Sequence, residues 1–539
     1  MFHFLKNSWK LDLGKFSRRE LFRRGSMVSL PLLLPGKLAA SLTGTQKLRA
    51  GQDVYHSIGV RPLINARGTF TIISGSLMLP EVRAAMQEAA QHYVHLDELA
   101  EAIGARLAEL TKAEWGMVSS GCAAGLTHAT AACVAGGNPD LHVRIPNLAG
   151  FPKDEVIIPK HSRNVYDAAV RAVGVRVIEV ETVEELEDAL GPRTAMAYIL
   201  AGPQADKSPL NTRTVAQLAR QKGVPVLVDA AAEVLTVPNV HLENGAALVG
   251  YSGGKCVRGP QSAGLLLGQK DLVRAAWIHS APHHGFARSM KVGKEEAIGM
   301  LMAVEMWMQR DHQAEWKQWL AWLDHIAQRL SAIDGVRTSI AEPVGLSNRT
   351  PSLSIRWDRS RLGISGKAVA KLLFDTDPRI VTPGGRDPSG STESELTITP
   401  YMMSPGEEKI VADKLYTLLS NPPQRDQQPR TEPPRLDLSG QWDCRIEYVA
   451  GSSNHRFHLR QQGSRIEGTH QGDFVARDLS GSINGDEVQM SSFYSERHGD
   501  SLMFNFTGKV SGDEISGVLD MEEYLTAKWT ARRHEYRKG

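Results

Sequence analysis

Short apolar runs alternate with helical segments over residues 115–268, and this alternation restricts the chain to very few folds. Runs that read as buried strands lie at 115–118, 154–159, 176–180, 195–201, 225–228, 246–251 and 262–267. Segments with helical spacing, such as 165–173 and 214–222, stand between them. The alternation predicts an α/β fold with a mostly parallel, doubly wound sheet, whose functional site lies at the carboxyl ends of the strands.

One lysine stands at the end of such a strand. The run at 246–251 leads into a Ser-Gly-Gly-Lys turn, and Gly-Pro-Gln precedes the next run. Lys255 therefore lies on a tight glycine loop between two buried strands. An amine in such a place is partly removed from water, which favours its neutral, nucleophilic form. The alternative is a surface hairpin whose lysine points into solvent.

An acidic residue, Asp229, ends the strand at 225–228. Strand, acid, connecting segment, strand and lysine form the arrangement that a pyridoxal phosphate site requires. The lysine forms a Schiff base with the cofactor, and the carboxylate keeps the pyridinium nitrogen protonated. A strand-end aspartate is also a common helix N-cap. Asp229 and Lys255 together favour the cofactor.

Two further segments supply candidate cofactor contacts. A Ser-Ser-Gly turn follows the first strand and opens an alanine-rich helix, whose N-terminal N–H groups bind anions. We expect Ser120, Gly121 and Cys122 to contact the cofactor phosphate, although an ordinary capped helix would look similar. His161 lies just beyond the strand at 154–159, where it either stacks on the pyridine ring or is a satisfied structural residue.

The first forty residues indicate export rather than part of the fold. Residues 17–22 read Ser-Arg-Arg-Glu-Leu-Phe, a twin-arginine pattern, and an uncharged, moderately apolar stretch follows at 25–36. That stretch is too short to span a membrane. We expect export of the folded protein through the twin-arginine route, to the periplasm or otherwise out of the cytoplasm, and the alternative is a basic amphipathic arm.

The remaining chain divides by composition. Residues 81–113 and 297–330 show helical spacing, and we expect the four tryptophans of the second stretch (307, 316, 319 and 322) to be core or subunit-interface residues. The predicted parts are an export signal at 1–40, a large cofactor-binding domain at 53–330, a small α+β domain at 331–420, a proline-rich linker at 421–435 and a C-terminal antiparallel β-barrel or sandwich at 436–539.

Composition excludes several function classes. The 539 residues carry a formal net charge of +2 without a basic stripe, so nucleic acid is not an expected partner. Four cysteines without a CxxC pair give neither a disulfide framework nor a metal site. His455, His458 and His470 do not have a metal-binding spacing, and no metal is expected.

The chain resembles one branch of the fold-type-I pyridoxal phosphate enzymes over about residues 53–420. The branch contains L-seryl-tRNA(Sec) selenium transferase (selenocysteine synthase) and D-glucosaminate-6-phosphate ammonia lyase. The similar segments are INARGTFT, SSGCAAGL, EVIIPKHSRNVYDAAVRAVG, VPVLVDAAAE and, the most distinctive, YSGGKCVRGPQSAGLLLG. The tRNA-using members carry an N-terminal tRNA-binding domain where this chain has the export pattern, and the C-terminal β-domain is not part of the family pattern.

The resemblance implies roles for individual residues. By it, Lys255 is the Schiff-base lysine, Asp229 the pyridinium partner, His161 the ring-stacking residue, and Ser120, Gly121, Cys122 and Ser252 the phosphate contacts. It also implies a homodimer or higher homo-oligomer in which residues 258–261 serve a neighbouring pocket.

We therefore expect a lyase that eliminates ammonia from a small amino acid or amino-sugar acid. An arginine of the small domain should bind the substrate carboxylate, with Arg356, Arg379 and Arg386 as unranked candidates. One alternative is a transferase that uses the same cofactor chemistry on another acceptor. An alternative of another class is an exported binding protein whose pyridoxal fold is catalytically idle.

Overall fold

The computed structural model describes residues 51, 54–423, 432–496 and 501–535, so the predicted export signal lies outside the described residues. The chain divides into a leading unit that ends at Leu63 and a second unit that begins at Ile64. The described part of the leading unit contains a 3-10 turn at His56–Ile58. In the described ranges, no helix is both long and apolar enough to cross a membrane.

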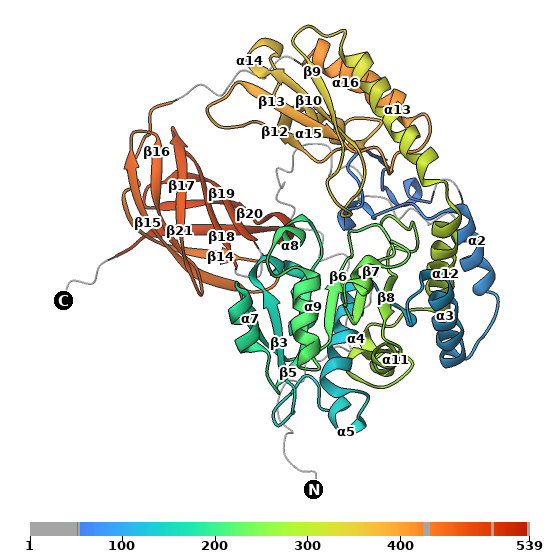
Figure 1. Ribbon diagram of the computed structural model, residues 1–539. Coiled ribbons are helices and arrows are strands. Elements are labelled where there is room, and N and C mark those ends of the chain that lie inside the picture. Colours follow the sequence, from blue (N-terminus) through green and yellow to red (C-terminus); the bar gives the residue numbers. More distant parts are fainter. Residues whose placement is uncertain (1–50, 52–53, 424–431, 497–500, 536–539) are drawn as a thin grey trace, which may run out of the picture. The chain divides into compact units, whose positions relative to one another are not determined.

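A seven-stranded sheet forms the centre of the second unit (Figure 1). Its strands are β2 (Trp115–Ser119), β3 (Glu155–Pro159), β4 (Arg176–Val180), β5 (Thr194–Leu200), β6 (Val226–Asp229), β7 (Leu248–Ser252) and β8 (Gly264–Gly268). Their order is β2-β8-β7-β6-β5-β3-β4. All neighbours are parallel except β8, which runs antiparallel to both β2 and β7. The predicted mostly parallel α/β sheet is confirmed.

Successive strand residues point to opposite faces of this sheet, and each face has its own apolar core. Ile157 and Val228 belong to one core, whereas Ile158 and Leu227 belong to the other. Helices α3 (Leu96–Thr111), α9 (Thr212–Gln221) and α12 (Lys294–Gln309) cover the first face, and α4 (Cys122–Ala135) and α11 (Lys270–His279) cover the second.

A smaller antiparallel sheet has a separate core. It is built from β9 (Arg337–Ala341), β10 (Ser352–Asp358), β12 (Gly385–Arg386) and β13 (Glu393–Ile398) in the order β12-β13-β10-β9. Helices α13 (His312–Leu330), α15 (Gly366–Asp375) and α16 (Glu407–Ser420) pack apolar residues against it. The short β1 (Ile64–Asn65) pairs in parallel with β11 (Ile380–Val381), which brings the start of the unit into this core.

Two expected helices are each broken in the structure. Residues 81–113 form α2 (Pro80–Ala89) and α3, separated by a segment that contains the fully exposed Tyr93. The break lets α2 pack on α12 while α3 packs on the large sheet. Residues 297–330 form α12 and α13, because the Asp311 side chain accepts hydrogen bonds from the N–H groups of Gln313 and Ala314 and caps a new helix.

Residues 440–533 form a closed eight-stranded barrel, which decides between the expected barrel and sandwich. Its strands follow chain order: β14 (Gly440–Glu447), β15 (Ser452–Gln462), β16 (Arg465–Gln471), β17 (Ala476–Asn484), β18 (Glu487–Ser495), β19 (Ser501–Ser511), β20 (Glu514–Asp520) and β21 (Thr526–Arg533). Pairing of β14 with β21 closes the ring. Alternate residues of each strand fill the interior, which includes the fully buried Trp442, Phe457, Phe506 and Trp529.

Part of the barrel interior is polar. Two buried imidazoles share a hydrogen bond, because His455 Nδ1 lies 2.7 Å from His470 Nε2. The other ring nitrogen of His470 lies 2.7 Å from Ser492 Oγ. The guanidinium of Arg477 stacks 4.5 Å from the centre of the Phe504 ring. In the portion of the chain that the structure describes, no group of three or more His, Cys, Asp or Glu side chains could hold a metal ion.

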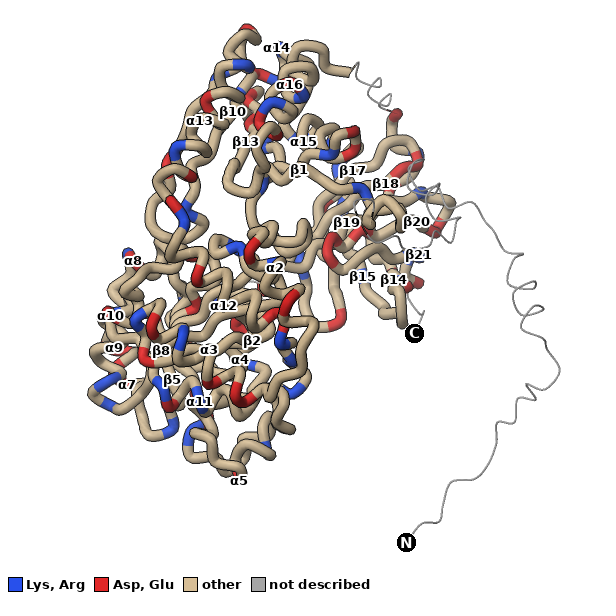
Figure 2. Tube along the Cα trace, turned by 90° about the vertical axis from the view of Figure 1, so that its right-hand side faces the viewer, with Lys and Arg blue, Asp and Glu red and all other residues tan. Residues whose placement is uncertain are grey.

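Charged residues of both signs are interspersed along the trace in Figure 2, in keeping with the formal net charge of +2.

Candidate active site

Lys255 is half-buried on a loop that closes tightly upon itself between β7 and β8. A Cβ added at Gly253 would lie 2.7 Å from the carbonyl oxygen of Ala263, and one at Gly254 would lie 2.7 Å from the Cα of Gln261. Only glycine allows the two limbs of the loop to approach so closely. The loop joins the antiparallel strands β7 and β8 and places Lys255 at the wall of a cavity.

Asp229 ends β6, the strand next to β7, and is 2% exposed. Its Oδ1 accepts hydrogen bonds from Ala231 N at 3.0 Å and Cys122 Sγ at 3.7 Å, and its Oδ2 accepts one from the Tyr198 hydroxyl at 3.0 Å. Burial raises the pKa of this carboxyl group, and the three donors and the charge of Lys255 oppose that shift. Within the described residues, no cationic side chain forms an ion pair with Asp229. The carboxylate is therefore available to a cationic N–H group.

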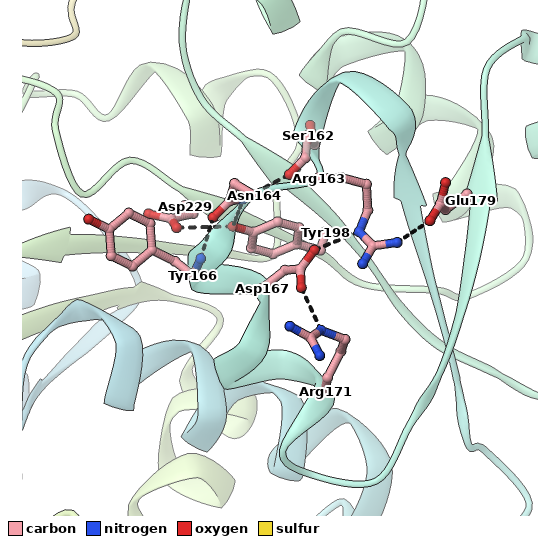
Figure 3. A network of polar contacts seen from close by, with 9 residues as sticks. All are labelled: Ser162, Arg163, Asn164, Tyr166, Asp167, Arg171, Glu179, Tyr198 and Asp229. Atoms are coloured by element: carbon pink, nitrogen blue, oxygen red, sulfur yellow. Dashed lines mark hydrogen bonds and ion pairs between the residues drawn. The ribbon is translucent and has the colours of Figure 1, made fainter. Parts of the chain in front are cut away.

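Tyr198 connects Asp229 to the loop that follows β3 (Figure 3). The side-chain amide of Asn164 donates to the Tyr198 hydroxyl at 3.1 Å and to the Ser162 carbonyl oxygen at 2.8 Å. Because the hydroxyl accepts from Asn164, its own hydrogen points to Asp229. The sequence places Tyr198 in a strand but assigns it no role; the available signal was a hydroxyl-bearing ring in the strand beside that of Asp229.

A buried charge cluster holds this loop in place. Asp167 is fully buried and accepts hydrogen bonds from Arg163 Nε at 2.6 Å and Arg171 Nε at 2.7 Å. Arg163 also pairs with Glu179 of β4, as Figure 3 shows. A carboxylate paired with two guanidinium groups has its buried charge well compensated. The cluster therefore fixes the position of Asn164 relative to the sheet.

His161 lies in the 3-10 turn Lys160–Ser162, directly after β3. The side chain is half-buried, and its Nε2 has no hydrogen-bond partner among the described residues. Burial lowers the pKa of the imidazole and so favours the neutral ring. No hydrogen bond or ion pair in the described part of the chain joins His161 to Asp229 or Lys255. A neutral ring with an unpaired nitrogen suits contact with a planar group, and the stacking role stays a prediction.

The predicted phosphate turn connects β2 to α4. Gly121 adopts a φ of 86°, and Ser119 Oγ donates to its carbonyl oxygen at 2.8 Å. Gly264 of β8 pairs with both Ser119 and Ser252, which brings the turn and Ser252 to one edge of the sheet. A side chain at Gly264 would collide with the turn, because its Cβ would lie 2.3 Å from the carbonyl carbon of Gly121. The turn, with Ser120 at its tip, thus faces the same edge as the lysine loop.

Cys122 differs from the expectation in one respect. It begins α4, but its thiol is directed at Asp229, and burial raises the pKa of the thiol well above its usual value. The backbone N–H of Cys122, rather than its side chain, is the group available to an anion.

Residues 258–261 contact an exposed segment of the chain near its start. Arg258 adopts a φ of 56°, an uncommon conformation for a side-chain-bearing residue, and its Nε donates to the Leu77 carbonyl oxygen at 3.0 Å. Gln261 Nε2 donates to the Thr71 carbonyl oxygen at 3.2 Å. Between these contacts Ile72 is 84% exposed.

A cavity of about 740 Å³ opens beside Lys255 between the two sheets. Three arginines line it: Arg258, Arg310 and Arg349. The candidates from the sequence do not. Arg356 pairs with Glu395 on the small sheet, Arg379 donates to the Phe374 carbonyl oxygen, and Arg386 is exposed outside the lining. The cavity is also lined by all four tryptophans of the 297–330 stretch, which the sequence predicted to be core or interface residues.

Comparison with known proteins identifies the family. No family model matches the chain. It is 30% identical over 359 residues to D-glucosaminate-6-phosphate ammonia lyase of Salmonella typhimurium, covering 62% of this chain and 94% of that protein. The solved structure of a D-glucosaminate-6-phosphate ammonia-lyase matches with a TM-score of 0.60 at 28% identity, covering 68% of this chain and 98% of that one. The chain belongs to this branch of the fold-type-I pyridoxal phosphate enzymes.

Two other members of the branch differ in activity. A 5'-C-glycyluridine monooxygenase-decarboxylase of a Streptomyces species is 31% identical over 377 residues, which cover 68% of this chain and 92% of that enzyme. An L-seryl-tRNA(Sec) selenium transferase of Proteus mirabilis is 25% identical over 213 residues, covering 34% of this chain and 44% of that enzyme. The protein is thus an enzyme of a pyridoxal phosphate-dependent lyase family, and its relatives differ in substrate.

Proposed function

We propose that the protein is a pyridoxal phosphate-dependent lyase that releases ammonia from a small amino acid or amino-sugar acid. The observation that carries the proposal is the buried carboxylate of Asp229, which has no ion-pair partner among the described residues and lies one strand away from the loop of Lys255.

Three features fit the cofactor. Asp229 offers a buried negative charge to a cationic ring nitrogen, and Lys255 offers an amine at the cavity wall. The third feature is the turn at Gly121, where a Cβ would meet no atom within 4 Å, so an anion has room beside the N-terminus of α4. Bound there, the cofactor supplies a protonated ring that takes up the electron pair left at the substrate α-carbon.

Residues of this chain carry out the proton transfers and hold the Asp229 carboxylate in place. Lys255 in its neutral form removes the proton from the substrate α-carbon and returns protons later in the reaction. Tyr198 and the Ala231 N–H group donate to Asp229, which keeps the carboxylate oriented and favours its ionised form. Loss of the α-proton and the β-hydroxyl, followed by hydrolysis of the resulting imine, converts the amino acid into a keto acid and ammonia. The water lost in the elimination is regained in the hydrolysis, so atoms balance.

Lys255→Ala tests the assignment of the lysine. We expect the folded variant to lose the visible absorption band of the bound cofactor and all turnover, because its Schiff-base partner is gone. Borohydride reduction of the wild type should then label the peptide that contains Lys255. Lys317 lines the same cavity and provides the matched control, since Lys317→Ala should keep both band and label. A label on any other lysine would overturn the assignment.

Product analysis separates the lyase from its alternatives. The purified enzyme should release ammonia and a keto acid in equal amounts from a panel of D- and L-amino acids and amino-sugar acids, without oxygen. Oxygen consumption with release of carbon dioxide would instead indicate chemistry like that of the monooxygenase-decarboxylase relative. Turnover that requires a second acceptor would favour a transferase, and a colourless protein that cannot be reconstituted would favour an idle binding protein.

We also propose export by the twin-arginine route, on the pattern at residues 17–22. Replacing Arg18 and Arg19 with lysine should leave the protein in the cytoplasm, folded and carrying its cofactor. The reason is that lysine keeps the charge but not the planar, multi-donor geometry of arginine. Cell fractionation measures this, and unchanged export would contradict the proposal.

A homo-oligomer is the third part of the proposal. The segment around Ile72 exposes apolar side chains next to residues 258–261, where it would be covered by a second copy. Light scattering of the purified protein tests this, and a monomer at micromolar concentration would overturn it.

A further inference from the structure

An aromatic wall lines part of the cavity beside Lys255. It consists of Trp307 on α12, of Trp316, Trp319 and Trp322 on α13, and of Tyr401. Because Trp316, Trp319 and Trp322 are spaced three residues apart, they lie on one face of α13. The break between α12 and α13 allows this face and Trp307 to line the same cavity.

The rings of this wall are held in fixed positions. The centres of the Trp316 and Trp319 rings lie 6.0 Å apart at an angle of 58°, and Trp319 meets Tyr401 edge to face at 6.1 Å. The Tyr401 hydroxyl is fixed by Thr69, whose N–H donates to it at 3.0 Å. The Trp307 indole donates to the Leu235 carbonyl oxygen at 2.8 Å. A wall held in this way is preorganised, so ligand binding loses little conformational entropy in ordering its side chains.

Packing accounts for only part of the surface of two of these tryptophans, Trp316 and Trp319. Trp322 is 9% exposed and belongs to the core of the small sheet. Trp319 packs against the edge of the same core, but, like Trp316, it is only half-buried and lines the cavity with the indole surface that stays open. Large aromatic surface that stays open beside a reactive lysine is typical of a ligand site.

The cavity around the wall has a polar rim, which includes the cationic side chains of Arg258, Lys317 and Arg349 as well as Arg310. Arg310 pairs with Glu315 through two hydrogen bonds of 2.9 and 2.8 Å and donates to the Cys256 carbonyl oxygen at 3.0 Å, so its charge is compensated. The rim carries side chains that hydrogen-bond well to hydroxyl groups: Gln313, Gln318, Glu342 and Asn348. In the described part of the chain, these four side chains have no hydrogen-bond partner.

We propose that the substrate carries, besides its reacting amine, a sugar ring that stacks on Trp316 and Trp319. The flat C–H faces of a sugar ring match the indoles, and its hydroxyl groups match the amide and carboxylate rim. The inference rests on the proposed function, because Lys255 marks the end of the cavity where the amine reacts. It narrows that function from a small amino acid or amino-sugar acid to an amino acid that bears a glycosyl group.

Three amino acids that differ only in their side-chain substituent provide the test. Serine has no ring, O-glucosylserine has a sugar ring and O-benzylserine has an aromatic ring; both enantiomers of each are used with the full-length holoenzyme. Rapid-mixing tryptophan fluorescence gives the dissociation constants without requiring turnover. We expect O-glucosylserine to bind at least tenfold more tightly than serine or O-benzylserine. Equal binding of all three, or a preference for the benzyl compound, would overturn the proposal.

Tryptophan variants test which side chains cause the preference for O-glucosylserine. Trp316→Leu and Trp319→Leu should each remove most of it, whereas Trp316→Phe and Trp319→Phe, which keep a flat ring, should retain a larger part. Trp277 on α11 is also half-buried but lies outside this cavity, so Trp277→Leu should keep the full preference. A preference that survives both leucine variants would overturn the assignment of the wall.

Ammonia release is measured separately on the same compounds. Preferential binding of O-glucosylserine without release of ammonia would count against the proposed lyase, and not against the wall. Ammonia release with no preference for the glucosyl compound would count against the wall alone.

Discussion

The environment of Asp229 combines burial with three hydrogen-bond donors, and the two effects act in opposite directions. Burial disfavours the charged carboxylate, while Ala231 N, Tyr198 and Cys122 favour it. An ionised carboxylate that cannot reach water attracts any cation placed beside it more strongly than an exposed one would. The residue is thus suited to holding a ring nitrogen in its protonated form.

Asp229→Asn should keep the fold and the bound cofactor but lose turnover. The amide can still accept the Tyr198 hydrogen bond, yet it cannot stabilise a pyridinium charge. Loss of one such electrostatic interaction costs about 3 kcal/mol, or roughly a hundredfold in kcat/KM. Steady-state kinetics measure the loss. Asp154→Asn, which removes an acid paired with Arg193 near the other end of β3, provides the control and should change kcat/KM little. Turnover near that of the wild type would reduce Asp229 to a helix cap.

The sequence predicts the site residues that stand in a recognisable local pattern. It does not predict the residues whose role depends on which strands are neighbours in the fold. Lys255 and Asp229 were predictable, because a glycine-flanked lysine and a strand-end acid are visible as local patterns. Tyr198 and Asn164 were not, because their roles depend on which strands lie side by side. The four tryptophans of the 297–330 stretch were predicted to be core or subunit-interface residues. Trp322 is a core residue, but helical spacing alone does not say whether a ring meets protein or a cavity, and all four also line the cavity.

The lysine loop is the element whose geometry tolerates least change. Gly253→Ala would place a Cβ 2.7 Å from Ala263 O and 2.8 Å from Pro260 O, and both are backbone atoms that cannot simply rotate away. We expect the loop to open, with a loss of roughly 1–3 kcal/mol in stability and a weaker hold on the cofactor. Thermal unfolding and cofactor absorbance measure both effects.

Gly191 offers a matched control for that substitution. Outside the adjacent residues, the atom nearest to a Cβ there would be the Ala189 carbonyl oxygen at 3.9 Å, which is an ordinary contact. Gly191→Ala should therefore leave stability and cofactor absorbance unchanged. If Gly253→Ala behaves in the same way, the tight closure of the loop is not required for the site.

The paired imidazoles inside the barrel predict a dependence of stability on pH. Burial, with repulsion from His455 and Arg477, lowers the pKa of His470 to about 3, compared with 6.5 for an exposed imidazole. The unfolded barrel therefore binds more protons than the folded one between about pH 6.5 and 3. Its free energy of unfolding should fall with decreasing pH in that window, by up to about 1.4 kcal/mol per pH unit for this one group.

His470→Gln should flatten this dependence, since an amide does not titrate there. Hydrogen exchange of peptides from residues 440–533, measured at several pH values and corrected for intrinsic rates, gives the slope. His458, exposed on the outer side of β15, provides the control, and His458→Gln should keep the wild-type slope. An unchanged slope in the His470 variant would contradict the assignment.

At the scale of the whole molecule, the sequence predicted individual strands and helices better than the way in which they pair and pack. Alternating runs indicated the large sheet and the C-terminal strands, because strand periodicity is local. Whether eight strands close into a ring depends on the pairing of β14 with β21, the first and last of the set, for which no local signal exists. The breaks at 90–95 and 310–311 were missed for a related reason: each lets two helices pack against different partners.

The antiparallel strand β8 also sets the order in which the molecule can be completed. In the sheet, β2 has β8 as its neighbour, and β8 begins only at Gly264. During synthesis, β2 therefore has no partner strand until residue 268 has emerged from the ribosome. The turn that follows β2 and the lysine loop are then assembled in one step, against the same glycine. Cofactor capture must follow this step, and chains that stop before it expose an unpaired strand edge to other nascent proteins.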